Sequence, residues 1–212
     1  MIYYEINKDN KKIKSRIENY IEYHQFFKSF THNKINPIVN FINNNNMVLF
    51  KDKINFKEAG GKGFKAHQDF PAWSDFPPTY YSTATLFANN SNSENGCLEF
   101  SPYNYNNGLL PYDISKGGHI DEDISNNLEW QFVETTPRDV VIFDSFVPHK
   151  SGPNDSLTER RNVYFTYNMC SEGDYYNSYV SKKRIEFPPE IDREANKDYS
   201  VGTKYNLANP IN

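Results

Sequence analysis

Two histidines and an aspartate have the order and spacing of an iron-binding facial triad. His67-Gln68-Asp69 places two possible ligands one residue apart, and His149 lies far downstream. In an extended backbone, residues i and i+2 project to the same side, so His67 and Asp69 can converge on one ion. Two histidines and one carboxylate hold one face of Fe(II) and leave three positions for a chelating cosubstrate and dioxygen. The pattern predicts His67, Asp69 and His149 as catalytic metal ligands.

An arginine after the second histidine has the chemistry to hold a dicarboxylate cosubstrate. Arg160 follows His149 by eleven residues, and Ser151 lies between them. A planar guanidinium group matches a carboxylate with two parallel, charge-assisted hydrogen bonds. Arg160 and Arg161 begin an expected strand and point to opposite faces, so only one can face the interior, and we expect it to be Arg160. An exposed charge pair is the alternative. With Ser151 as a further donor, the spacing predicts 2-oxoglutarate as the cosubstrate.

A strand expected over 47–57 carries a second group of candidate binding residues. Alternation places Lys51, Lys53 and Asn55 on one face. If Asn55 donates a hydrogen bond to 2-oxoglutarate, both lysines also point inward, and buried lysines are costly without anions. That arrangement would form an anion-binding wall beside the iron, with Trp73 as a further candidate substrate contact. The alternative is an edge strand whose lysines lie in water.

The remaining histidines are weaker candidates for a metal site. His119-Ile120-Asp121 repeats the His-x-Asp pattern, but it lies in a glycine-flanked acidic run with no preceding strand to aim the ligands. His24 and His32 have no carboxylate two residues later. The chain contains no His-x-His, which disfavours a cupin with another metal.

The pattern of apolar residues predicts a mainly β fold with helices at the N-terminal end. Helical spacing of apolar side chains predicts an amphipathic helix over 11–30, and a shorter helix is expected over 36–42. Many short strands separated by Gly, Pro and Asn clusters indicate a sandwich or barrel with the helices packed on one face. The expected strands are 47–57, 80–88, 96–100, 130–134, 139–144 and 162–168.

Bulk composition is consistent with a single domain over 1–212. We expect helical support in 1–46, a β core in 47–170 and an extended C-terminal wrap in 171–212. Lys+Arg 23 against Asp+Glu 27 gives a net charge of −4, so no nucleic-acid partner is expected. No apolar run reaches the ~20 residues of a membrane span, and the first residues lack the pattern of a signal peptide. Two cysteines fit a reducing compartment, so a cytoplasmic monomer or homodimer is expected.

These residues resemble the phytanoyl-CoA dioxygenase superfamily of Fe(II)/2-oxoglutarate-dependent oxygenases. The chain is most similar to the 2-aminoethylphosphonate hydroxylase branch, and ectoine hydroxylase shares fewer of its features. The resemblance implies a double-stranded β-helix (jelly roll), with iron at the triad and 2-oxoglutarate beside Arg160, Ser151 and Asn55. The stretches that carry it are 51–57, 67–69, 94–99, 143–154, 182–189 and 206–210.

Together, these residues predict a dioxygenase that hydroxylates a C–H bond of a small anionic or zwitterionic substrate. An aminophosphonate is the first candidate. Asp69 supplies a carboxylate where a small residue would leave a position vacant for halide, so hydroxylation is expected rather than halogenation. Fe(II), 2-oxoglutarate and dioxygen are the expected cofactors. The alternatives are a hydroxylase of ectoine or another small metabolite, and a non-catalytic binding protein on the same scaffold.

Overall fold

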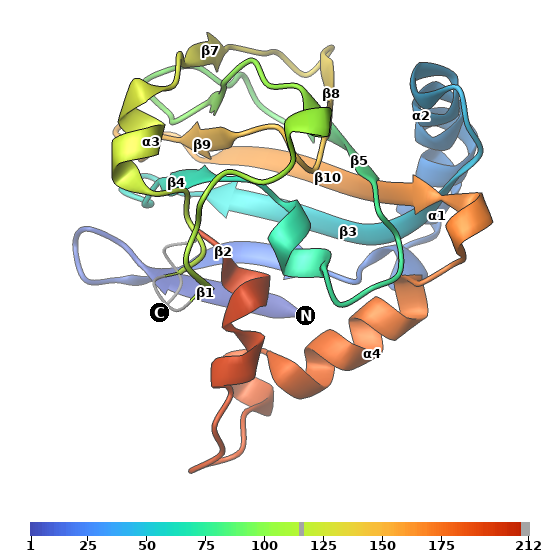
Figure 1. Ribbon diagram of the computed structural model, residues 1–212. Helices are drawn as coiled ribbons and strands as arrows, with labels where there is room; N and C mark the ends of the chain where they lie inside the picture. Colours follow the sequence, from blue (N-terminus) through green and yellow to red (C-terminus); the bar gives the residue numbers. More distant parts are fainter. Residues whose placement is uncertain (115–116, 209–212) are drawn as a thin grey trace.

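Two antiparallel sheets form the body of the protein, and a computed structural model describes its residues 1–114 and 117–208 (Figure 1). Within those residues the larger sheet has the order β1-β2-β3-β10-β5-β8 and the smaller one the order β4-β9-β6-β7. The structure confirms the predicted fold class, a mainly β protein with a double-stranded β-helix. Two predicted features fall partly outside the described residues. Lys116 belongs to the run that contains His119-Ile120-Asp121, and residues 209–210 belong to the C-terminal stretch that resembles the family. The strands are β1 (Ile2–Ile6), β2 (Lys12–Glu18), β3 (Met47–Lys57), β4 (Phe64–His67), β5 (Tyr81–Phe87), β6 (Leu98–Phe100), β7 (Gln131–Val133), β8 (Val140–Asp144), β9 (His149–Ser151) and β10 (Arg160–Met169).

The pairing of β3 with β10 organises the interior of the larger sheet. Lys53 lies opposite Tyr164, and Lys57 lies opposite Arg160. Because side chains alternate along a strand, every second residue of these two strands faces the same side. β3 is flanked by β2 and β10 and is therefore not an edge strand. The alternative in which its lysines lie in water is wrong.

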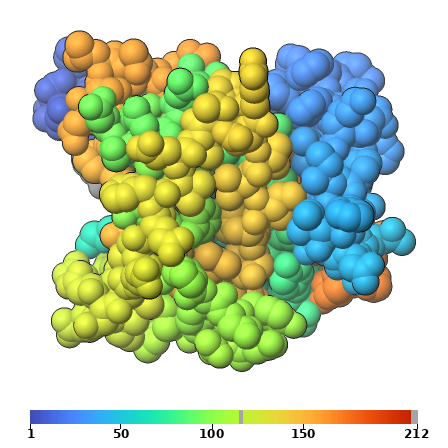
Figure 2. All heavy atoms as spheres, turned by 90° about the horizontal axis from the view of Figure 1, so that it is seen from above, coloured from blue at the N-terminus to red at the C-terminus, as the bar shows by residue number. Residues whose placement is uncertain are grey.

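A helical segment packs against one end of the larger sheet. It runs through α1 (Gln25–Phe30), the π-helix η2 (Thr31–Ile35) and α2 (Asn36–Asn43). Ile35 and Val39 are buried against Met47, Phe165 and Tyr167. The helix predicted over 36–42 is confirmed, and it ends where Asn44 adopts a left-handed conformation. Seen from above, this segment (blue) stands beside the strands rather than covering the whole face (Figure 2).

The helix predicted over 11–30 is wrong in its first half, which forms strand β2. A hairpin joins β1 to β2, and its turn is held by Asn7 Oδ1, which accepts hydrogen bonds from the backbone of Asp9 and Lys11. Ile13 and Ile17 are four residues apart, a spacing that suits both a helix face and one side of a strand. Pairing of β2 with both β1 and β3 decides between them. The N-terminal residues therefore extend the sheet instead of supporting it as a helix.

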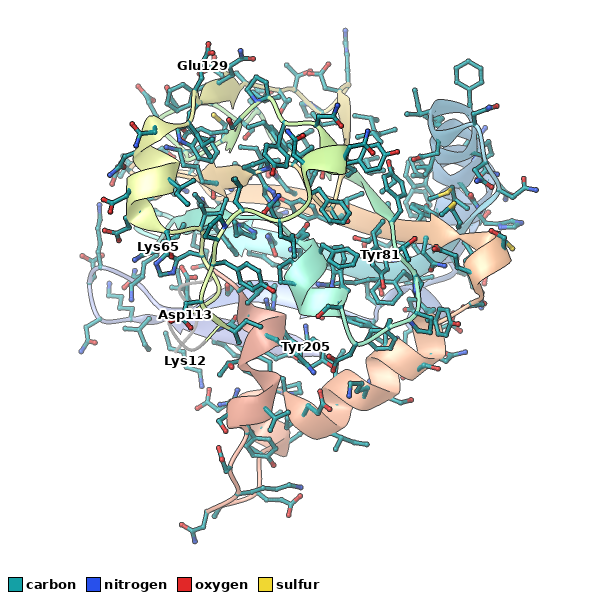
Figure 3. All side chains as sticks on the ribbon, viewed as in Figure 1. Lys12, Lys65, Tyr81, Asp113, Glu129 and Tyr205 are labelled. Carbon is teal, nitrogen blue, oxygen red and sulfur yellow. The ribbon has the colours of Figure 1, made fainter. Side chains whose placement is uncertain are left out.

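The C-terminal region contains a helix that the sequence did not indicate. α4 (Tyr176–Glu186) packs along β3, and the chain then continues through η7 (Glu190–Asp192) and η8 (Ser200–Asn206). Tyr205 of η8, labelled in Figure 3, joins a buried aromatic cluster with Trp73 and Tyr179. The expected extended wrap is therefore helical in part and reaches the core. The other short elements are η1 (Ile21–Tyr23), η3 (Phe70–Trp73), η4 (Tyr105–Asn107), α3 (Glu122–Asn127) and η6 (Cys170–Glu172).

None of the helices in the described part of the chain has the length and apolar character needed to cross a membrane.

Candidate metal centre

Adjacent strands bring the two predicted histidine ligands together. β4 and β9 pair so that His67 lies directly opposite His149, and their ring centroids are 4.1 Å apart. Asp69 follows β4 at the start of η3. Its Oδ1 lies 3.8 Å from His67 Nε2, and its Oδ2 lies 3.8 Å from His149 Nε2. Ligand atoms of all three residues lie within 4.8 Å of one another, so one ion can be shared among them.

Backbone carbonyls orient both imidazole rings toward this point. His67 Nδ1 lies 2.8 Å from the carbonyl oxygen of Lys65, and His149 Nδ1 lies 3.0 Å from that of Val147. A carbonyl can only accept, so each Nδ1 carries the hydrogen and each Nε2 presents a lone pair. Burial, then the neighbouring His149, lowers the pKa of His67 to about 3. His67 is therefore a neutral imidazole, which is the form that binds metal.

The aspartate is held ionised and in place. Burial raises its pKa, but electrostatic interactions with His149 and His67, and then with Lys53, outweigh burial and lower the pKa of Asp69 overall. Gln68, between the two ligands, donates from Nε2 to the Phe146 carbonyl at 2.5 Å. Two imidazoles and one carboxylate match the donor set of an Fe(II) facial triad.

One pocket contains the triad and the residues predicted to hold 2-oxoglutarate. Arg160 is only 3% exposed, whereas Arg161 is exposed and pairs with Glu159. Arg160 Nε donates to the carbonyl of Asn95 at 3.1 Å, while its buried Nη1 has no hydrogen-bond partner among the described residues. A buried guanidinium nitrogen without an acceptor is costly unless an anion fills the pocket. The predicted residues that line this pocket are Lys51, Lys53, Asn55, His67, Asp69, Trp73, His149, Ser151 and Arg160.

Lys57 is a neighbour of this site to which the sequence pattern assigned no role, although alternation places it on the face of Asn55. Its Nζ donates to Ser151 Oγ at 2.8 Å, to the Gly152 carbonyl at 2.5 Å and to the Gly96 carbonyl at 3.3 Å. Burial, and then the charge of Arg160, lowers the pKa of Lys57 well below its ordinary value. Alternation along 51–57 carried the signal, because Lys57 lies on the same face as Asn55.

Basic side chains of β3 form another part of the pocket lining. Lys53 Nζ lies 4.6 Å from the centre of the Tyr164 ring, and Lys51 Nζ lies 5.5 Å from that of Trp73. Burial, followed by the charge of Lys51, lowers the pKa of Lys53 to about 7. The structure also adds Arg16 of β2 and Tyr205 of η8 to the lining, neither of which the sequence indicated.

The competing histidines do not line the pocket of the triad, although the second His-x-Asp run lies beside β4. Ile120 donates its backbone N–H to the carbonyl of Ala66, and Asp121 precedes helix α3. His24 packs against the ring of Phe27, 4.9 Å between centroids. Within 1–114 and 117–208 the triad is the one group of three metal-ligating side chains.

A comparison with protein families decides the class of this site. The model described as phytanoyl-CoA dioxygenase (PhyH) matches residues 5–162. The chain belongs to the phytanoyl-CoA dioxygenase family. It is therefore an Fe(II)/2-oxoglutarate-dependent dioxygenase, with iron at the His-Asp-His triad.

Two proteins with similar sequences are named for phosphonate substrates. The chain is 40% identical over 214 residues to the 2-aminoethylphosphonate dioxygenase of uncultured bacterium HF130_AEPn_1, covering 100% of this chain and 81% of that protein. It is 41% identical over 140 residues to the methylphosphonate hydroxylase of Gimesia maris, covering 66% of this chain and 52% of that one. The chain thus spans about half the length of the second relative.

Solved structures of this fold are more distant. EctD from S. alaskensis with 2-oxoglutarate and 5-hydroxyectoine matches with a TM-score of 0.63 at 16% identity, over 79% of this chain and 61% of that one. EvdO2 from Micromonospora carbonacea with 2-oxoglutarate matches with a TM-score of 0.64 at 17% identity, over 79% and 76%. At these identities the likeness establishes the fold alone.

Proposed function

We propose that this dioxygenase hydroxylates a C–H bond of a small phosphonate, with an aminophosphonate such as 2-aminoethylphosphonate as the first candidate. The observation that carries the proposal is the basic wall beside the triad. Lys53 lies in the pocket with no ion pair to a described carboxylate, and Lys51 has only a distant one, 3.9 Å from Glu18. A small dianion would compensate these charges. The names of the two relatives support the same substrate class.

The roles of the pocket residues follow from their chemistry. His67, Asp69 and His149 would hold iron. Arg160 would grip the distal carboxylate of 2-oxoglutarate, and Ser151 would donate to the same group. Asn55 would contact the cosubstrate from β3, where its buried Oδ1 has no partner among the described residues.

When bound, iron with 2-oxoglutarate and dioxygen supplies the oxidation: a C–H bond becomes C–OH while 2-oxoglutarate becomes succinate and CO2. The protein's own residues bind and orient the reactants. Arg160 and Ser151 fix the cosubstrate at one end of the pocket, and the lysines fix the substrate at the other. Trp73 closes part of the wall, because its side chain is buried and its ring lies over Lys51. Water is thereby excluded from the reacting bond.

Succinate formation with Fe(II), 2-oxoglutarate and a substrate panel tests the proposal. The panel pairs 2-aminoethylphosphonate and methylphosphonate with their carboxylate counterparts and with ectoine. We expect stoichiometric succinate and hydroxylated product only with phosphonates. Turnover of ectoine or a carboxylate alone would overturn the substrate class. No substrate-dependent turnover, with metal affinity unchanged in His67→Ala, would favour the non-catalytic alternative.

We propose that the whole chain acts as one such domain in a reducing compartment, the cytoplasm. Cys97 and Cys170 are both free thiols, which supports that setting.

A further inference from the structure

Arg16 is a buried arginine of the pocket whose guanidinium group is not fully paired within the protein. It lies on β2 opposite Asn55 of β3, and it is only 3% exposed. Its side chain lines the same pocket as the triad. Its Nε forms an ion pair with Glu18, whereas its buried Nη2 has no hydrogen-bond partner in the described part of the chain. A buried guanidinium nitrogen in this state favours a bound anion as acceptor, because a buried donor without a partner is costly.

Positive charge exceeds negative charge around Arg16. Glu18 is the carboxylate of this cluster, and its Oε2 accepts a hydrogen bond from Lys183 at 2.5 Å. Its Oε1 lies 3.2 Å from Arg16 Nε and 3.9 Å from Lys51 Nζ. Glu18 therefore faces three basic side chains, and Lys53 adds a fourth to the same wall. Asp52 and the metal ligand Asp69 are the other carboxylates that act on Lys51, so four basic side chains meet three carboxylates. Uncompensated buried charges of one sign favour a bound counterion.

We propose that Arg16, with Lys51 and Lys53, binds the phosphonate group of the substrate and is the residue by which the enzyme selects phosphonates. The inference rests on the proposed function, which supplies the phosphonate. A guanidinium fork offers two parallel donors to the oxygens of a tetrahedral oxyanion. The two lysines add point charges that favour a dianion over a monoanionic carboxylate.

The subsite of Arg16 is separate from that of Arg160. Arg16 lies on β2 and Arg160 on β10, with β3 between them. Two strand spacings amount to about 10 Å. Each guanidinium group also has its own unpartnered nitrogen among the described residues. The two guanidinium groups therefore offer separate anion positions, one for 2-oxoglutarate at Arg160 and one for the substrate at Arg16.

Aromatic rings hold Arg16 in its orientation. Its Cζ lies 4.6 Å from the centre of the Tyr3 ring and 6.0 Å from that of Phe187. The Tyr3 hydroxyl in turn donates to the Phe187 carbonyl at 2.8 Å. These contacts leave the guanidinium little freedom to lose on binding, which favours affinity.

Calorimetric titration of the Fe(II)- and 2-oxoglutarate-loaded protein with methylphosphonate and with inorganic phosphate, without oxygen, tests the assignment. The variants are Arg16→Met, Arg16→Lys and, as a matched control, Arg161→Met on the exposed face of β10. We expect Arg16→Met to weaken binding of both anions about 10- to 100-fold, as for loss of a charged hydrogen-bond donor. Arg16→Lys should recover part of the affinity, and Arg161→Met should match the wild type. The KM for 2-oxoglutarate should stay within about threefold in all four proteins.

The possible outcomes distinguish a failure of the Arg16 subsite from a failure of the proposed phosphonate substrate. Unchanged anion affinity in folded Arg16→Met, or in Arg16→Lys if the first variant does not fold, would overturn the subsite. Phosphonate turnover with an unchanged KM in these variants would also overturn it and leave the proposed function standing. If the wild type hydroxylates no phosphonate yet binds phosphate in an Arg16-dependent way, the anion subsite is supported and the proposed substrate falls. Equal rises in the KM for both reactants would indicate a structural role and overturn the assignment.

Discussion

Lys57 donates a hydrogen bond from Nζ to Ser151 Oγ, 2.8 Å away, and so determines the direction of the serine hydroxyl. The same Nζ also donates to the carbonyls of Gly96 and Gly152, which uses all three ammonium hydrogens. Because Ser151 Oγ accepts from Lys57, its own hydrogen is directed elsewhere, toward the pocket that Ser151 lines. Lys57 is thus a positioning residue that makes Ser151 a donor to 2-oxoglutarate.

Lys57→Met should raise the KM for 2-oxoglutarate about tenfold, equivalent to ~1.4 kcal/mol of lost binding. The KM for the phosphonate should change little, because Lys57 lies at the Arg160 end of the pocket. Steady-state succinate formation at varied concentrations of each reactant measures both constants. Ser151→Ala should have a similar effect, and the double variant should be less than additive. A parallel rise in both constants would contradict the positioning role.

Substrate binding should weaken as the pH rises through 7. Burial, and then the charge of Lys51, lowers the pKa of Lys53 to about 7, and only its ammonium form attracts an anion. Below pH 7 Lys53 of the substrate-free enzyme carries its charge. Above pH 7 Lys53 loses its proton, and the KM for the phosphonate should rise up to about tenfold per pH unit. In Lys53→Arg the charge persists, since arginine does not deprotonate in proteins. The substrate's own ionisation is common to both proteins, so the ratio of their KM values reports Lys53, and a ratio independent of pH would contradict the prediction.

The triad could be predicted because its determinants are local. His67 and Asp69 are one residue apart on a strand end, and His149 follows a short apolar strand. Strand alternation also placed Arg160 inside and Arg161 outside. The same rule places Lys57 on the face of Asn55, but alternation alone does not reveal its contact with Ser151.

Arg16 could not be predicted because its position depends on pairing between distant segments. Ile13 and Ile17 fit either a helix or a strand, so local periodicity left the choice open. The register that sets Arg16 opposite Asn55 joins residues about 40 apart and is determined by tertiary packing. Tyr205 was missed for the same reason, since a polar tail carries no local sign of the pocket it reaches.

Removing the amino group of the substrate should cost little. Asp69 is the sole carboxylate that lines the pocket in the described part of the chain, and iron would occupy it. A substrate ammonium group therefore has no fixed anion to bind, and ethylphosphonate should show a KM within about fivefold of that of 2-aminoethylphosphonate, or ~1 kcal/mol. Competition between the two phosphonates in one reaction measures the preference directly. A preference of about 100-fold for the amine would show that another carboxylate enters the site.

Metal binding should stabilise the folded chain through the triad. Fe(II) at 100 times its dissociation constant adds ~2.7 kcal/mol, which raises the Tm of a protein of this size by about 5–10 °C. Anaerobic thermal melts with Fe(II) and with excess chelator measure the shift. His149→Ala should abolish it, whereas His32→Ala, on an exposed helical position, should keep it. An undiminished shift in His149→Ala would mean that iron binds elsewhere.

Asn154→Ala should destabilise the loop that joins His149 to Arg160. Asn154 is fully buried, and its Nδ2 donates to the carbonyls of Lys57 and Thr158 at 2.8 Å each. Its Oδ1 accepts from the backbone and the hydroxyl of Ser156. Loss of these buried bonds should lower the free energy of unfolding by ~2–4 kcal/mol, measured by urea denaturation of the apoprotein. Since the loop carries Arg160 into β10, the KM for 2-oxoglutarate should rise as well. Ser156→Ala removes the contacts of a half-buried hydroxyl with Asn154 and Thr158 but keeps both Nδ2 bonds of Asn154, and it should cost ~1 kcal/mol. Equal losses in the two variants would show that Asn154 does not hold the loop.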